Sequence, residues 1–213
     1  MNELTVQSFL SIGGGGGNSL SNRTDKTFIG IDFGILTTVV SIALIDVPSQ
    51  TIICKSLSLK QMLEDGSIYE SELVPSVVAF KNNRVFVGQG ASDLKYELKR
   101  GHDIWYSFKM ELGEDLGVKY YDSVLKDKEP FCIKNPKDVA RFFFMYLKRA
   151  IEKYCDENGL SKNIDYAISI PASFEANQRK DLLEALEANN MLVKGQSLID
   201  EPNAAFISYI VAI

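Results

Sequence analysis

The stretch Phe28-Ile-Gly-Ile-Asp-Phe-Gly34 decides how the rest of this sequence is interpreted. Its first five residues predict a β-strand that ends at Asp32, and the next two residues predict a turn. The apolar run 38–46 predicts a second strand that is covered on both faces, and 51–57 predicts a third. The ordered chain therefore opens with a meander in which an acid-glycine turn joins the first two strands.

Helices and strands alternate in the second half of the chain, after a polar excursion expected at 58–72 and a helix expected near 91–100. Asn135 and Pro136 predict the start of a long helix, because asparagine is a good N-cap and proline suits the first helical position. Gly159 fits just beyond its end. The elements expected next are strand 166–170, helix 175–189, strand 197–200 and an apolar helix over 203–212. This order predicts an α/β fold with a mixed five-stranded sheet.

The chain is expected to have three parts. Residues 1–27 contain the glycine run 13–17 and several serines and asparagines, so they are expected to form a disordered tail. A phosphate-binding loop is disfavoured there, because no Gly-Lys-Ser/Thr ending follows the run. The core subdomain is expected to comprise 28–72 and 137–213, and 73–136 are expected to form a smaller α/β subdomain inserted into it.

Composition and charge exclude several classes of protein. The 213 residues are 46% hydrophobic and 24% charged, which is typical of globular domains. A net charge of −5 disfavours general binding to nucleic acids, which draws on clustered lysine and arginine. Three scattered cysteines favour a reducing compartment, and no apolar run approaches the roughly 18 residues of a membrane span. A cytoplasmic protein that binds neither nucleic acid nor membrane is expected.

Three residues fall at predicted strand ends, where ligands of such sheets bind: Asp32, Pro171 and Glu201. The Asp32 carboxylate suits Mg²⁺, which prefers oxygen ligands and keeps much of its hydration. Gly34 would let the backbone approach a phosphate closely. Taken alone, the same residues also fit a hairpin turn, a strand end and the first turn of a helix.

Five segments together carry a more specific pattern. They are Phe28-Ile-Gly-Ile-Asp-Phe-Gly34; Leu73-Val-Pro-Ser-Val-Val-Ala-Phe80 with Val87-Gly-Gln-Gly-Ala91; Phe108-Lys-Met-Glu-Leu-Gly113; Ala167-Ile-Ser-Ile-Pro-Ala-Ser-Phe174 with Asn177-Gln-Arg179; and Leu198-Ile-Asp-Glu-Pro-Asn-Ala-Ala205 with Tyr209. In this order they resemble the heat shock protein 70 chaperones, and the first resembles the phosphate loop of the actin-like ATPases. The resemblance covers roughly 28–210 and implies one lobe of the actin-like ATPase, or ribonuclease H-like, fold.

The resemblance implies ATP or ADP and Mg²⁺ as cofactors, with a role for each matching residue. Asp32 and Glu201 would order Mg²⁺ through water, and Lys109 would reach toward the γ-phosphate and the attacking water. The residues that would face the phosphates are Gly34, Ile35, Leu36 and Thr37. Pro171 and Arg179 match the pair that passes nucleotide state to the substrate-binding part of the family. The implied reaction is phosphoryl transfer to water, in which positioning and charge stabilisation supply most of the catalysis.

Two departures from the family keep a second hypothesis open. Ile35 and Leu36 stand where the family has two small hydroxyl residues, so two side-chain donors are missing. The second phosphate loop does not occur in the sequence, and half a site cannot enclose ATP. The chain is therefore expected to be a first lobe that works with a second lobe, co-chaperones and unfolded protein substrates. The alternative is a non-hydrolysing binding or regulatory module derived from that lobe. A sugar kinase or filament protein is disfavoured by the chaperone-like segments 75–80 and 201–205.

Overall fold

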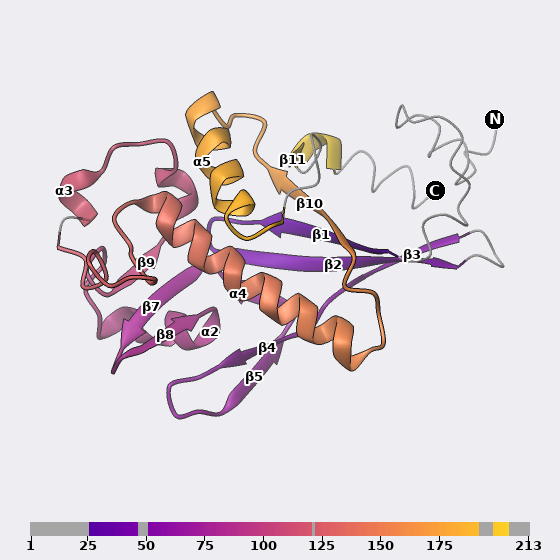
Figure 1. Cartoon of the computed structure of the whole chain (residues 1–213), viewed down its shortest axis with the longest axis horizontal. Coiled ribbons are helices and arrows are strands. Elements are labelled where there is room, and N and C mark those ends of the chain that lie inside the picture. The colour runs from indigo at the N-terminus through magenta and orange to yellow at the C-terminus, as the bar shows by residue number, and fades with distance from the viewer. Residues whose placement is uncertain (1–25, 47–50, 121, 192–197, 205–213) are drawn as a thin grey trace.

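The computed structural model describes residues 26–46, 51–120, 122–191 and 198–204. It is a mixed α/β structure in which two long helices lie against one face of a twisted sheet (Figure 1). A second, smaller sheet and a separate β-hairpin lie beside this main layer (Figure 1). The main sheet and its helices position the candidate site.

The main sheet contains parallel and antiparallel pairs, and its strands run in the order β11-β10-β1-β2-β3. These strands are β1 (Thr27–Phe33), β2 (Thr37–Asp46), β3 (Thr51–Ser56), β10 (Ile164–Ile170) and β11 (Leu198–Asp200). The pairs β1–β10 and β10–β11 are parallel, whereas β1–β2 and β2–β3 are antiparallel. The expected count of five strands was wrong, because β6 (Leu73–Pro75) also pairs with β2 and makes the sheet six-stranded.

Helices α4 (Pro136–Glu157) and α5 (Ala176–Glu187) cover the core face of this sheet. Alternation along β1 directs Ile29, Ile31 and Phe33 into the core, where all three are buried. The predicted start of α4 is confirmed, since the Asn135 side chain accepts a hydrogen bond of 2.9 Å from the backbone N–H of Asp138. Gly159 follows the helix with a φ of 65°, which is the left-handed conformation predicted for a residue just beyond a helix end.

The smaller sheet has the order β8-β7-β9, built from β7 (Val77–Lys81), β8 (Arg84–Val87) and β9 (Ile104–Tyr106). It packs against α2 (Gln89–Ser92) and the 3-10 helix η2 (Asp93–Tyr96), where a single helix near 91–100 was wrongly expected. Further along the chain lie the 3-10 helix η3 (Phe108–Glu111) and α3 (Gly117–Tyr120). The division at 73–136 stays a prediction: β6 belongs to the main sheet, whereas β7 to β9 form their own sheet.

The expected polar excursion at 58–72 is instead a regular hairpin of β4 (Leu59–Met62) and β5 (Ile68–Ser71). Leu59 and Gln61 alternate along β4 and are both buried, so the hairpin packs against the rest of the protein with few apolar side chains. Gly66 in the turn has a φ of 86°, and its N–H donates to the Leu63 carbonyl over 3.1 Å. Asp65-Gly66 is a turn-forming pair that sequence analysis overlooked.

Both ends of the chain are described in part. Most of the tail expected over 1–27 lies outside the described residues. The expected end of the tail was wrong, because Thr27 is ordered: it begins β1, and its hydroxyl donates to the Ser161 carbonyl over 2.7 Å. At the other end, 201–204 are helical, and the rest of the helix expected over 203–212 lies outside the described residues. Within the described ranges, no helix has the length and apolar character needed to cross a membrane.

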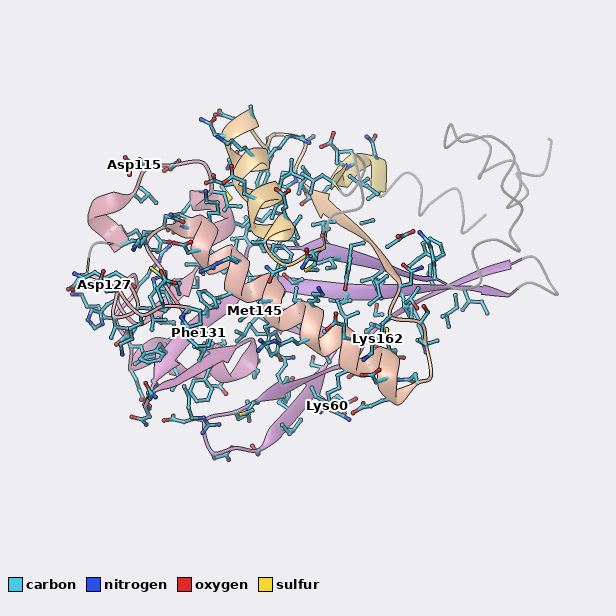
Figure 2. The ribbon with its side chains drawn as sticks, in the orientation of Figure 1. Lys60, Asp115, Asp127, Phe131, Met145 and Lys162 are labelled. Carbon is cyan, nitrogen blue, oxygen red and sulfur yellow. The ribbon has the colours of Figure 1, made fainter. Side chains whose placement is uncertain are left out.

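Replacement of a buried core aromatic should destabilise the fold strongly. Phe143→Ala removes a ring with no exposed surface, so the free energy of unfolding should fall by about 3–5 kcal/mol. Phe131→Ala, whose ring is 43% exposed beside the start of α4 (Figure 2), should cost about 1 kcal/mol or less. Urea unfolding followed by circular dichroism measures both, and equal losses would contradict this account of the core.

Candidate functional site

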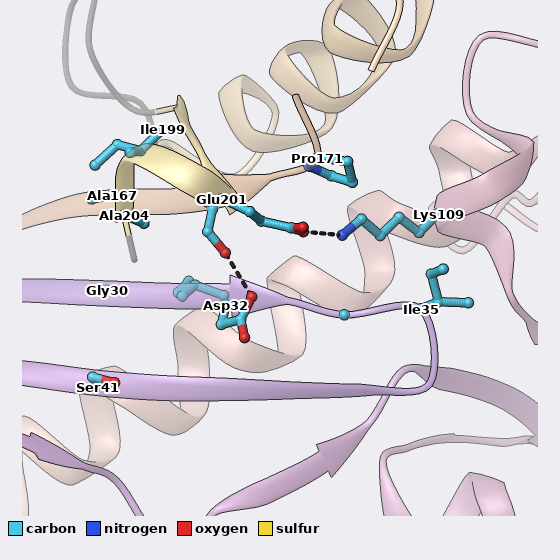
Figure 3. Close-up of a pocket in the computed structure, with 13 residues that line it drawn as sticks. Gly30, Asp32, Ile35, Ser41, Lys109, Ala167, Pro171, Ile199, Glu201 and Ala204 are labelled. Atoms are coloured by element: carbon cyan, nitrogen blue, oxygen red, sulfur yellow. Dashed lines mark hydrogen bonds and ion pairs between the residues drawn. The ribbon is translucent and has the colours of Figure 1, made fainter. Parts of the chain in front are cut away.

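Asp32, Lys109 and Glu201, which are far apart in the sequence, line one open hollow of about 760 Å³ (Figure 3). The hollow lies where the parallel strands β1, β10 and β11 end, the edge at which open α/β sheets bind ligands. Six of the predicted site residues line it: Asp32, Gly34, Ile35, Lys109, Pro171 and Glu201. Leu36, Thr37 and Arg179 are not among the lining residues.

Lys109 is the most deeply buried charge of this hollow, with a side chain only 3% exposed. Its ammonium lies 3.1 Å from Glu201 Oε1 (Figure 3). It also donates a short hydrogen bond to the Phe33 carbonyl. The rings of Phe33 and Phe174 lie 5.4 and 5.7 Å from the same nitrogen, within range of a cation–π interaction. A carboxylate, a carbonyl and two ring faces thus compensate a charge that would otherwise be costly to bury.

An aromatic cluster connects the strand that carries Asp32 to the turn that carries Lys109. The Phe33 ring lies 6.0 Å from that of Phe108 and 5.1 Å from that of Phe144 on α4. Phe108 in turn packs 5.7 Å from Phe143 in an edge-on arrangement. Because Phe33 and Phe108 directly adjoin Asp32 and Lys109 in the sequence, packing of the core sets how close these two site residues come.

Asp32 projects from the face of β1 opposite the core, and it is exposed between buried Ile31 and Phe33. Ser169 stands next to it on β10 and donates a hydrogen bond of 2.6 Å to Asp32 Oδ1. Sequence analysis did not select Ser169, because its role depends on the parallel register between two strands that are distant in the chain. Ser169 orients the carboxylate toward the hollow, and its own hydroxyl also lines it.

The loop between β1 and β2 is tight and is held from behind. A Cβ atom at Gly34 would lie 2.0 Å from the Thr37 carbonyl oxygen, so this position requires glycine. The buried Ser76 binds the loop twice: its hydroxyl donates to the Gly34 carbonyl and its N–H to the Leu36 carbonyl, both over 2.8 Å. Nothing in the sequence pattern singled out Ser76.

The two residues that depart from the family pattern lie at the tip of this loop. Ile35 lines the hollow and is 38% exposed, whereas Leu36 is 71% exposed. Thr37 is exposed and begins β2. The loop therefore presents the apolar side chain of Ile35 at the hollow, and neither Ile35 nor Leu36 supplies a side-chain donor for an anion.

Pro171 lines the hollow, whereas Arg179 lies outside it and contacts residues that adjoin it. The Arg179 guanidinium donates to Asp200 Oδ1 over 2.6 Å and, through Nε, to the Phe174 carbonyl over 3.1 Å. It thereby ties the end of β11 to the segment that follows β10. Glu201 comes directly after Asp200, so this ion pair holds the carboxylate that contacts Lys109.

The donor atoms of the hollow suit a hard cation that keeps its water. Asp32 and Glu201 supply carboxylate oxygens and Ser169 a hydroxyl, all of which Mg²⁺ accepts. Within the described part of the chain, no three or more histidine, cysteine, aspartate or glutamate side chains are grouped for metal binding. These oxygen donors fit a Mg²⁺ ion that is held largely through its water.

Comparison with known proteins gives distant similarity to one chaperone. No protein-family model matches the chain. The chain is 28% identical over 184 residues to "Chaperone protein DnaK" of Mycoplasma mobile, which covers 86% of this chain and 25% of the relative. It is 30% identical over 135 residues to the protein of the same name from Mesomycoplasma hyopneumoniae strain 232, covering 63% of this chain and 20% of the relative. The chain thus spans a quarter or less of these relatives, and the similarity suggests at most a heat shock protein 70-like family.

The hydrogen bonds of Arg179 to Asp200 and to the Phe174 carbonyl form a clamp on the end of β11. Loss of this clamp should loosen the strand end that precedes Glu201. In Arg179→Ala, two hydrogen bonds of a charged group disappear, which corresponds to about 1.5 kcal/mol or more of local stability and roughly tenfold faster amide exchange in 198–201. Lys180→Ala, at an exposed neighbouring position, should leave this exchange unchanged. Hydrogen–deuterium exchange with mass spectrometry measures both, and identical profiles for the two variants would contradict the clamp.

Proposed function

We propose that this chain forms the first lobe of a heat shock protein 70-like chaperone ATPase. In this role it binds the phosphate and Mg²⁺ side of ATP or ADP and requires a second lobe to complete the site. The observation that carries the proposal is the convergence of Asp32, Lys109 and Glu201 on one hollow at the carboxyl edge of the sheet. The distant similarity to DnaK supports the same assignment independently of the geometry.

Each residue of the hollow has a distinct role in this proposal. Bound Mg²⁺ supplies charge that neutralises phosphate oxygens, and Asp32 and Glu201 hold the water around it. An ammonium group has three N–H donors, and Phe33 and Glu201 account for two of those on Lys109. The third is available for a phosphate oxygen, so Lys109 is placed to stabilise charge that develops during transfer to water.

The coupling role of Pro171 and Arg179 is also proposed. Pro171 lines the hollow, and Arg179 contacts the residue next to Glu201 through Asp200. A change at the phosphates that moves Glu201 would therefore reach α5 through a single ion pair. We place the readout of this coupling in a substrate-binding part outside this chain, with unfolded proteins and co-chaperones as partners in the cytoplasm.

The alternative function is a non-hydrolysing binding or regulatory module. The exposed apolar side chains of Ile35 and Leu36 at the tip of the phosphate loop favour it. They supply no hydroxyl donor, and their branched side chains occupy space beside the place proposed for the γ-phosphate. Such a lobe would use the same hollow to bind a nucleotide or a partner without turnover.

The isolated chain should bind nucleotide weakly. Its hollow is open rather than enclosed, so ATP would stay largely hydrated. Isothermal titration calorimetry of the 213-residue chain with Mg-ATP should therefore show no submillimolar binding. A micromolar affinity would show that this lobe alone encloses the nucleotide and that the two-lobed proposal is wrong.

In a protein with both lobes, Lys109 should matter for turnover more than for affinity. Lys109→Ala, and Lys109→Met as a bulkier variant, should lower ATP turnover on the order of 100-fold, because a donor to the developing charge is lost. Nucleotide affinity should change little, and Lys60→Ala should leave both quantities intact, since Lys60 contacts Glu157 on the surface. Steady-state phosphate release measures turnover, and nucleotide titration measures affinity. Unchanged turnover would remove Lys109 from the mechanism, and nucleotide binding without turnover in the unmutated protein would favour the alternative.

A further inference from the structure

The outer strand of the β4–β5 hairpin has a free edge. Among the described strands, β5 pairs with β4 alone, and it lies at the outer margin of the molecule (Figure 1). In an antiparallel pair, alternate residues direct their N–H and C=O groups away from the partner strand. These groups on β5 form a template for another strand.

Apolar side chains accompany this free edge. Met62 and Ile68 stand opposite each other across the hairpin and are 47% and 57% exposed. Tyr69, on the other face of β5, is 42% exposed. A strand that paired with β5 would cover these side chains and would gain apolar contacts in addition to its backbone hydrogen bonds.

The edge is also negatively charged and lacks an internal counter-charge. Glu70 and Glu72 are exposed, and neither forms an ion pair with another described residue. Lys60 stands opposite Glu70 in the register, but its ammonium lies 3.1 Å from Glu157 on α4. Edge strands are often protected by charged side chains, especially lysine, or by proline; in β5, Ile-Tyr-Glu-Ser, the one such residue is Glu70, whose charge would attract a basic partner.

The hairpin is held rigidly enough to act as a preformed surface. The buried Gln61 side chain accepts a hydrogen bond of 2.8 Å from the N–H of Gln89 and donates one of 3.1 Å to the Leu73 carbonyl. On the other side, the Tyr146 hydroxyl donates to the Lys60 carbonyl over 3.0 Å. These anchors lie on β4, so they leave the edge of β5 free while lowering the entropy that binding would cost.

We propose that the free edge of β5 binds an extended segment of a partner protein that alternates apolar and basic residues. Basic side chains would pair with the carboxylates of Glu70 and Glu72 on one face, and the apolar side chains that alternate with them would cover Tyr69 on the other face. A second copy of this chain is a poorer occupant, because edge-to-edge pairing would bring Glu70 and Glu72 of the two copies close together. None of these residues lines the hollow, so the inference stands independently of the proposed nucleotide site.

The test uses the full chain and two labelled peptides. One is acetyl-Thr-Lys-Val-Arg-Val-Lys-Thr-amide, and the other has glutamate in place of each basic residue. Fluorescence anisotropy at low ionic strength should show binding of the basic peptide and none of the acidic one, with affinity falling as salt rises. Hydrogen–deuterium exchange should show that the basic peptide protects the amides of 68–71.

A charge-reversed variant supplies the decisive comparison. Glu70→Lys with Glu72→Lys should weaken binding of the basic peptide at least tenfold and permit binding of the acidic one. The matched control, Glu114→Lys with Asp127→Lys, makes the same charge change at exposed positions between η3 and α4 and should leave affinity unchanged (Asp127 and Lys60 are labelled in Figure 2).

Four outcomes would overturn the proposal. They are absence of binding by the basic peptide, equal losses in the two double variants, protection of a segment other than 68–71, and self-association that protects 68–71 without peptide. The second would indicate unspecific attraction between charges. The last would assign the edge to a second copy of this chain.

Discussion

Burial of the Lys109 ammonium is the constraint on which the arrangement of this protein depends. The Lys109 side chain is 3% exposed, so its ammonium has lost most of its water and protein acceptors must replace it. Its acceptors come from two different strand ends, the Phe33 carbonyl on β1 and the carboxylate of Glu201 after β11. The charge is therefore satisfied only when η3, β1 and β11 come together, which is also the condition for a site to exist between them.

One face of the main sheet packs into the core, and the opposite face borders the hollow. Side chains such as Ile31 and Phe33 pack under α4, where they form the core. On the opposite face, the hollow is floored by small residues: Gly30, Ser41 and Ala167 lie side by side on three adjacent strands. Their small size leaves room above the sheet, and the carboxylate of Asp32 marks the polar end of that space. The alternation of side chains along each strand thus separates the core from the hollow without further elements.

Sequence analysis was most successful where the information is local or where motif order could be used. The cap at Asn135, the extent of α4 and the strands β1, β2 and β10 follow from neighbouring residues and were confirmed. The site residues were selected by resemblance to a family; the structure brings six of them to one hollow, and their chemical roles stay predictions. The hairpin at 58–72 was missed because polarity was given more weight than the Asp-Gly turn signal.

By itself, the sequence determined the longer helices and strands, because periodicity, caps and turn residues act over a few neighbours. It also determined the chemical types available at the strand ends. The tertiary structure alone decided which of them meet: the pairing of Ser169 with Asp32, the support of the loop by Ser76 and the clamp from Arg179 to Asp200. These contacts join segments that are distant along the chain, so they depend on strand register and core packing, which no local pattern encodes.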